Sequence, residues 1–334
     1  MSSSGLRLLA VLGVCFCIGC GSTASSRQSK PVEVRISVTR APLNYMPVYV
    51  AGPSGCFARE GIQVLLDETS GSVKSLQALE GGSVDVAATD YLVMLDLVRD
   101  AQPLREFVLL SKLPGLVVIA SPKASRPIRN LQDLKGRTVG VTTPGTAYHR
   151  LFNHILQIHG VNPDEVSVVG VGPGMSFVSS LERGVVDAGL VSAFTTSYLL
   201  RRYPTLTILV DTRTPESTRA ALGRDEVAFN VLCAREAWLR ANPQTARKLA
   251  SSMQCGLAWV RDHTPQQIRG VLPESGRSPD AEADFEAISS AKVSFTLDGQ
   301  MTPEAHAAAV RFLTTPNTAQ AKNQEPYTNE FLKP

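Results

Sequence analysis

One short phrase occurs twice in this chain and constrains its fold more than any other feature. Residues 79–86 read L-E-G-G-S-V-D-V, and residues 181–188 read L-E-R-G-V-V-D-A. Each copy follows a small-residue loop and a helix-like stretch, and each leads into a short apolar strand that ends in polar residues. The repeat predicts two similar α/β units, and the seam between such units is a common binding place for small molecules.

Strand-like and helix-like segments alternate through most of the chain, which is typical of parallel sheets covered by helices. Short apolar or alternating runs between loop residues mark the strands. In the first unit we expect strands at 34–39, 62–66, 84–88, 107–110 and 116–120. In the second unit we expect them at 138–141, 166–171, 188–191 and 206–210. The predicted fold class is α/β, with two lobes built on mostly parallel sheets and a ligand cleft between them.

The order of these segments predicts how the chain is divided. Its 334 residues suffice for two domains of ordinary size, and a strand at 227–233 returns to the first unit after the second is complete. We expect lobe 1 at 33–118 plus 228–334, lobe 2 at 122–222, and hinge segments near 119–121 and 223–227. Two crossings between lobes make a hinge that can open and close like a clamp.

Composition excludes several functions. The formal charge is only +3 and no Lys/Arg cluster stands out, so we expect no nucleic-acid partner. Cys17 and Cys20 have the spacing of a metal or redox pair, but they lie in an apolar leader with no second pair nearby. No GxSxG, HExxH or P-loop motif occurs. We therefore expect no metal, no cofactor and no catalytic residue, and a monomer.

The first twenty residues have the pattern of an export signal. Arg7 precedes an apolar run at 8–18 that is short for a membrane span. The following Gly19-Cys20 resembles a bacterial lipobox, which implies cleavage before Cys20 and a lipid on that cysteine. Residues 21–32 would then be a flexible tether to the membrane. The alternative is an ordinary signal peptide at 1–20, and both interpretations export the protein.

Three cysteines lie in the body of the chain. Cys56, Cys233 and Cys255 are far apart in sequence, and their number is odd. They could all be small buried residues, or two of them could form a disulfide. The sequence does not assign the pair.

Several segments resemble one protein family. Residues 47–62, which include G-C-F-A-R-E-G-I, resemble the "A…GxFxxEGL" opening of periplasmic solute-binding proteins. D-L-K-G-R-T-V-G-V at 133–141 resembles their "DLKGKxVGV" box, and A-R-E-A-W-L followed by N-P at 234–243 resembles "xxxFLxxNP". Together with the repeated phrase, they are most similar to the NMT1/THI5-like, SsuA/TauA-type binding proteins of ABC importers.

The resemblance implies a type II periplasmic-binding fold and a non-catalytic role. The protein would be lipid-anchored to a bacterial membrane, capture a small organic or anionic solute (sulfonate, nitrate or pyrimidine-like) outside the cytoplasm, and deliver it to an ABC permease and its ATPase. One alternative is a fold-related enzyme of thiamine-pyrimidine or menaquinone synthesis. The export leader argues against it, and the body cysteines do not form the thiamine-type motif. A periplasmic sensory protein that presents ligand to a receptor is a third reading.

Ligands of open α/β sheets bind beyond the carboxyl ends of the strands. Loops there begin helices and carry Ser, Thr and Gly, and the free N–H groups of a helix start suit an anionic or accepting group. Asp90 could bind an amino or ring N–H group, and Tyr45, Tyr91 and Phe194 could form an aromatic wall. The predicted ligand-binding residues are Asn44, Tyr45, Ser70, Ser72, Asp90, Tyr91, Thr143, Thr146, Ser192 and Phe194.

Each of these residues also has a purely structural alternative. The hydroxyl residues and Asp90 could be ordinary helix N-caps, and the aromatic residues could be core packing. The repeated acids Asp85 and Asp187 precede their strands, so we expect them at the opposite edge from the cleft. No arginine falls in these loops, which disfavours a tightly held sulfonate or dicarboxylate.

Overall fold

A computed structural model of the protein describes residues 31–100, 102–311 and 325–333. The predicted signal peptide, its lipidation site Cys20 and nearly all of the tether lie outside these residues. The chain divides into 1–30 and 31–334, and the fold below belongs to the second part. Within the described residues, no helix combines the length and the apolar character needed to span a bilayer.

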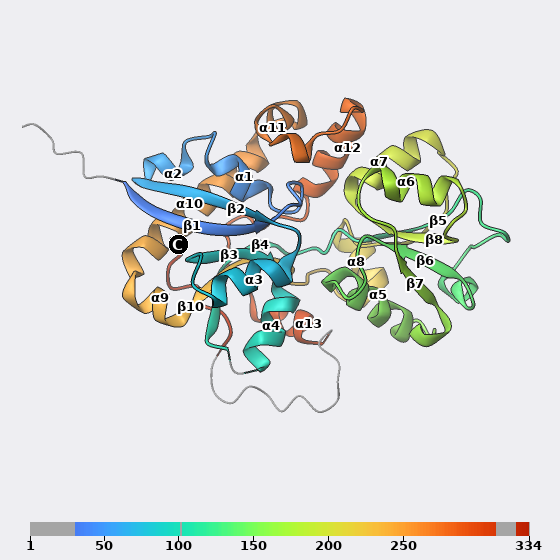
Figure 1. Ribbon diagram of the computed structural model, residues 1–334, viewed down its shortest axis with the longest axis horizontal. Coiled ribbons are helices and arrows are strands. Elements are labelled where there is room, and N and C mark those ends of the chain that lie inside the picture. Colours follow the sequence, from blue (N-terminus) through green and yellow to red (C-terminus); the bar gives the residue numbers. More distant parts are fainter. Residues whose placement is uncertain (1–30, 101, 312–324, 334) are drawn as a thin grey trace, which may run out of the picture. The chain divides into compact units, whose positions relative to one another are not determined.

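The first sheet has five strands in the order β2-β1-β3-β10-β4 (Figure 1). Strands β1 and β2, and β1 and β3, pair in parallel, whereas β10 is antiparallel to both of its neighbours. The bounds are β1 Val32–Thr39, β2 Ile62–Thr69, β3 Val86–Asp90, β4 Leu104–Ser111 and β10 Asn230–Arg235. A late strand therefore returns to the first sheet, as the sequence predicts, and it lies between β3 and β4.

Helices cover both faces of this sheet (Figure 1). One face packs against α1 (Met46–Ala51) and α10 (Pro243–Asp262), and the other against α3 (Ser72–Glu80) and α4 (Tyr91–Arg99). A Cβ on Gly256 of α10 would lie 2.5 Å from the carbonyl oxygen of Pro47, so only glycine permits the approach of α1. The other helices are α2 Cys56–Arg59, α9 Glu236–Ala241, α11 Pro265–Val271, the 3₁₀ turn η3 Glu274–Gly276, α12 Ala281–Lys292 and α13 Pro303–Val310.

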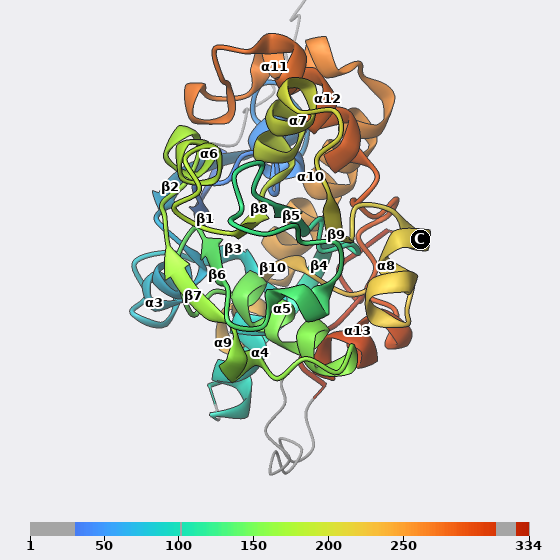
Figure 2. The same ribbon diagram turned by 90° about the vertical axis from the view of Figure 1, so that its right-hand side faces the viewer.

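The second sheet has the order β7-β6-β8-β5-β9 (Figure 2). Helices α6 and α7 pack on one face and α5 on the other. The strands are β5 Val117–Ala120, β6 Thr138–Val141, β7 Ser167–Gly170, β8 Ala188–Val191 and β9 Ile208–Asp211. The helices are η1 Leu131–Leu134, α5 Ala147–Ile158, η2 Pro163–Glu165, α6 Met175–Glu182, α7 Ala193–Arg202 and α8 Pro215–Leu222.

Strand β5 corrects one predicted boundary. It pairs with β8 and β9, and so belongs to the second sheet. The first crossing between sheets is therefore the segment 112–116, between β4 and β5, and not 119–121. An apolar run shows that a strand forms, but its partner is chosen by contacts distant in sequence. The return crossing lies between α8 and β10, and the remaining lobe limits stay a prediction.

The repeated phrase has the same structural task in both sheets. The backbone N–H of Asp85 donates to Arg35 O, and its carboxylate accepts from Arg35 N at 2.9 Å. Asp187 makes the same pair of bonds with Thr138, its Oδ2 lying 3.1 Å from the Thr138 nitrogen. Each acid thus fixes the neighbouring parallel strand at one residue, Arg35 within β1 and Thr138 at the start of β6.

A disulfide joins two helices that cover the first sheet. Cys56 of α2 is bonded to Cys255 of α10, with their Cα atoms 5.8 Å apart. Cys233 of β10 is a buried free thiol. The structure therefore settles the pairing that the sequence left open.

Candidate ligand-binding site

The strands of the first sheet bring polar residues together at one edge. Strands β3 and β4 end there, at Asp90 and Ser111, and the antiparallel β10 begins there with Asn230. The Asn230 side-chain nitrogen donates to Asp90 Oδ1 at 3.0 Å. Ser111 Oγ donates to the Asn230 side-chain oxygen at 2.9 Å and accepts from its backbone nitrogen at 3.0 Å. This fixes the amide so that its nitrogen points at Asp90.

Tyr45 and Ser72 also form hydrogen bonds with Asp90. We call these two residues, together with Asp90 and Asn230, the Asp90 cluster. The Tyr45 hydroxyl donates to Asp90 Oδ1 at 3.0 Å. The Ser72 hydroxyl accepts from the Asp90 backbone nitrogen at 3.2 Å. Three of the four were predicted to contact ligand. Asn230 was not, because the sequence does not show that the late strand starts at this edge.

Burial tunes the acid–base behaviour of the cluster. Desolvation raises the pKa of Asp90, and hydrogen bonds from Ser72 and Tyr45 and the charge of Arg150 work in the opposite direction. The pKa of Tyr45 is raised by burial and by the neighbouring Asp90, so its phenol stays a neutral donor. Asp90 itself is only half-buried, so the cluster can offer its acceptor oxygens in a partly desolvated setting, where a hydrogen bond to a solute N–H is strong.

Helix α5, which follows β6 of the second sheet, reaches this edge. The Asn44 side-chain nitrogen donates to the Tyr148 hydroxyl at 2.8 Å, and that hydroxyl donates to the carbonyl of Pro114 at 3.0 Å. Arg150 forms an ion pair with Asp96 of α4. Its charge also acts on Asp90. Elements of the two sheets thus meet at the Asp90 cluster.

The predicted site residues do not include Tyr148 and Arg150. Both lie in the first turn of α5, beyond the loop that follows β6, two and four positions past the N-cap Thr146. Side chains in the first turn of a helix point back toward its start, so the argument from strand ends extends to such positions as well as to the loops.

The carboxyl edge of the second sheet carries two predicted hydroxyl residues as N-caps. Thr146 caps α5 by accepting from His149 N at 3.4 Å. Ser192 caps α7 by accepting from Thr195 N at 3.4 Å, and its side chain is exposed. Thr143 is exposed in the loop before α5. The hydrogen bonds of Thr146 and Ser192 agree with the alternative in which these residues are ordinary helix N-caps. A contact with a solute stays a prediction.

Two predicted residues lie differently from expectation. Tyr91 is completely buried, and its hydroxyl lies 2.8 Å from Nδ1 of His306 on α13. Tyr91 is the first residue of α4, and its side chain points into the core. We therefore exclude Tyr91 from the proposed site. Ser70 is exposed in the loop after β2, next to the half-buried Gly71, and takes no part in the hydrogen bonds that join the Asp90 cluster.

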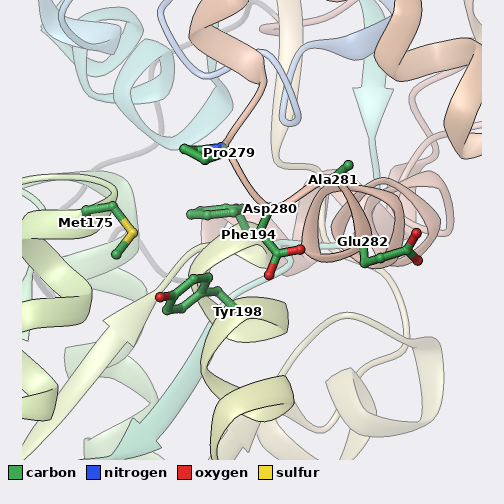
Figure 3. Close-up of a pocket in the computed structure, with 7 residues that line it drawn as sticks. All are labelled: Met175, Phe194, Tyr198, Pro279, Asp280, Ala281 and Glu282. Atoms are coloured by element: carbon green, nitrogen blue, oxygen red, sulfur yellow. The ribbon is translucent and has the colours of Figure 1, made fainter.

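Phe194 is not part of the Asp90 cluster. It lines a cavity of about 480 Å³. The cavity lies between the helices of the second sheet and the start of α12 (Figure 3). Its lining residues are Met175, Phe194, Tyr198, Pro279, Asp280, Ala281 and Glu282. Among the described residues, no group of three or more His, Cys, Asp or Glu side chains could hold a metal ion.

Two mixed sheets flanked by helices define a two-lobed α/β fold of the periplasmic-binding-protein kind. The periplasmic aliphatic sulphonate binding protein SsuA of Escherichia coli has this fold, with a TM-score of 0.67 and 17% identity over 85% of this chain and 91% of its own. The chain belongs to the NMT1/THI5-like family, whose model matches residues 43–268. Fold class and family are as the sequence predicts.

Two other proteins are similar to this chain. A solved structure from Bordetella bronchiseptica RB50 is 30% identical, with a TM-score of 0.77, and the match covers 90% of this chain and 96% of that one. YtlA, a candidate binding protein of Bacillus subtilis (strain 168), is 20% identical over 257 residues, which are 75% of this chain and 73% of YtlA.

Proposed function

We propose that this protein is the solute-binding component of an ABC importer and not an enzyme. The observation that carries the proposal is the Asp90 cluster. This largely buried polar group lies at the carboxyl edge of the first sheet, and the first turn of α5, which belongs to the second sheet, lies beside it. Family membership supports it. So do the names of fold neighbours, which describe SsuA as a sulphonate-binding and NrtA of Synechocystis as a nitrate-binding protein.

The solute would lie between the two carboxyl edges and contact residues of both. From the first sheet these are Asn44, Tyr45, Ser72 and Asp90. From the second they are Thr143, Thr146, Ser192 and Phe194. Contacts made to both sides at once exist only when the lobes approach, so the solute shifts the population toward the closed form. The hydrogen bond between Asn44 and Tyr148 would indicate the closed form, because it joins the two lobes.

Asp90 narrows the class of solute. A carboxylate at the centre of the cluster accepts hydrogen bonds and repels acceptor-only anions. Nitrate carries only acceptors, whereas a pyrimidine-like or amino-bearing organic solute presents N–H groups to Asp90. We therefore favour an organic solute with N–H donors, and any anionic part of it would bind near Arg150.

An exported location fits the disulfide. The bond between Cys56 and Cys255 persists in oxidising compartments and is rare in the cytosol of mesophiles. The proposed partners are an ABC permease and its ATPase. The proposed anchor is a lipid on Cys20, with the protein facing the periplasm or cell exterior as a monomer.

A thermal-shift screen of the exported protein against sulfonates, nitrate, pyrimidines and aromatic acids tests the proposal. A solute present at 100 times its Kd should stabilise the fold by about 2.7 kcal/mol. The substitution Asp90→Asn should remove most of that stabilisation for the same solute. Asp67→Asn, an exposed acid on β2, is the matched control and should not change it. Catalytic turnover of one of these compounds, without any stabilisation by ligand, would contradict the proposal.

A further inference from the structure

The cavity between α7 and α12 has the size of a small-molecule site. Its volume of about 480 Å³ lies within the range of about 300–1,000 Å³ that is usual for ligand pockets. Met175, Phe194 and Tyr198 line it from the second sheet's helices, and Pro279 and Asp280 line it from the start of α12 (Figure 3). The Asp90 cluster does not line it. The cavity is thus a separate hollow beside α7, whose N-cap is Ser192.

Its wall is apolar and incompletely covered. Met175 is 46% exposed and lies beside the two aromatic residues of this wall (Figure 3). The rings of Phe194 and Tyr198 are half-buried, 6.0 Å apart and tilted by 42°. A thioether and two rings in this arrangement present faces and edges against which a flat apolar body can pack.

The charge of the cavity is negative. Figure 3 shows the Asp280 carboxylate on the side of Phe194 and Tyr198, whereas the Glu282 carboxylate points away from them. Arg201 lies 3.8 Å from Asp280 but makes its shorter contact, 2.9 Å, with Glu286. None of the described residues that line the cavity is a lysine or an arginine. Aromatic faces and a carboxylate both attract a cation and repel an anion.

We propose that this cavity is a subsite for a flat apolar group that carries a positive charge. The inference rests on the proposed solute-binding function and specifies its solute, namely an organic cation with an aromatic or similarly flat body. Phe194 and Tyr198 would contact the flat body, and Asp280 the cationic group. Asp280 also caps α12 by accepting from Ala283 N at 3.0 Å, so the helix holds its carboxylate in place.

Isothermal titration of the exported protein with three matched probes tests the subsite. Benzylamine, benzyl alcohol and benzoate share a ring and differ in charge. We expect affinity to fall in that order. Phe194→Ala should weaken binding of benzylamine and benzyl alcohol by about tenfold. Asp280→Asn keeps a good N-cap and should weaken only benzylamine, by about threefold to fivefold. Glu216→Gln removes an exposed first-turn acid of α8 and serves as the control.

Three results would overturn the inference. They are tightest binding of benzoate, no binding of benzylamine, and benzylamine binding that neither Phe194→Ala nor Asp280→Asn weakens. The solute screen with Asp90→Asn separates this failure from failure of the proposed function. A solute that depends on Asp90 but not on Phe194 or Asp280 would leave the binding function standing and remove only the cavity's role.

Discussion

The disulfide between Cys56 and Cys255 offers the most quantitative test of the structure. It joins α2 to α10 across a sequence separation of 199 residues. We predict that the double substitution C56A/C255A destabilises the folded protein, because the unfolded chain regains the freedom that the cross-link removes.

The magnitude follows from the length of the closed loop. In the chain-entropy model the stabilisation grows with the logarithm of that length and is about 5 kcal/mol at 25 °C for a loop of this size. Measured losses for native disulfides are about 2–5 kcal/mol, because unfolded chains retain some structure. Cys56 is fully buried, so truncation to alanine adds a small packing loss. We expect a total loss of about 3–5 kcal/mol.

Urea unfolding followed by tryptophan fluorescence measures this loss. Trp238 and Trp259 lie on α9 and α10, beside the cross-linked region. Reductant should lower the midpoint of the wild type towards that of C56A/C255A and should not affect the double variant. The control C233A keeps the bond and should respond to reductant as the wild type does. A wild-type midpoint that is insensitive to complete reduction would refute the reasoning.

Two further predictions concern the core. Gly256→Ala places a Cβ 2.5 Å from Pro47 O, so it should cost about 1–3 kcal/mol in urea unfolding. Gly270→Ala in α11 is the matched control, where a Cβ meets nothing within 4 Å, and it should be neutral or stabilising; equal effects of the two would contradict the close approach. Burial raises the pKa of Glu106, whose carboxylate oxygens have no hydrogen-bond partner among the described residues. The contribution of protonated Glu106 to the free energy of unfolding is therefore fully present below the ordinary carboxyl pKa. It is lost as the pH rises through the pKa of Glu106 in the folded state. The stability of Glu106→Gln relative to wild type should thus increase between pH 5 and pH 8, and a constant difference would show that folding does not raise the pKa of Glu106.

Local pattern was enough for the strands of this fold and for part of the site, whereas the helix α8 was not predicted. The repeat placed Asp85 and Asp187 in equivalent positions, and both make the same two bonds to a neighbouring strand. Position at a strand end was enough to select Tyr45, Ser72 and Asp90, which the structure brings into contact.

The remainder depends on contacts between residues distant in sequence. The run at 117–120 forms a strand, but only pairing with β8 and β9 shows to which sheet it belongs. Tyr91 follows Asp90 directly, yet the direction of its side chain in the first turn of α4 carries it into the core. Arg150 enters the site from α5, and only tertiary packing brings it near Asp96.

The central place of β10 also affects when each part of the molecule can fold. Strands β5 to β9 lie between residues 117 and 211, so the second sheet can form from one continuous stretch of nascent chain. The first sheet lacks an inner strand until residue 235 has been made, and β4 has no partner in it before then. Long-range pairing of this kind is slow. We expect β4 to remain unpaired in this sheet until about two-thirds of the chain has been synthesised, whereas β1, β2 and β3 can pair earlier.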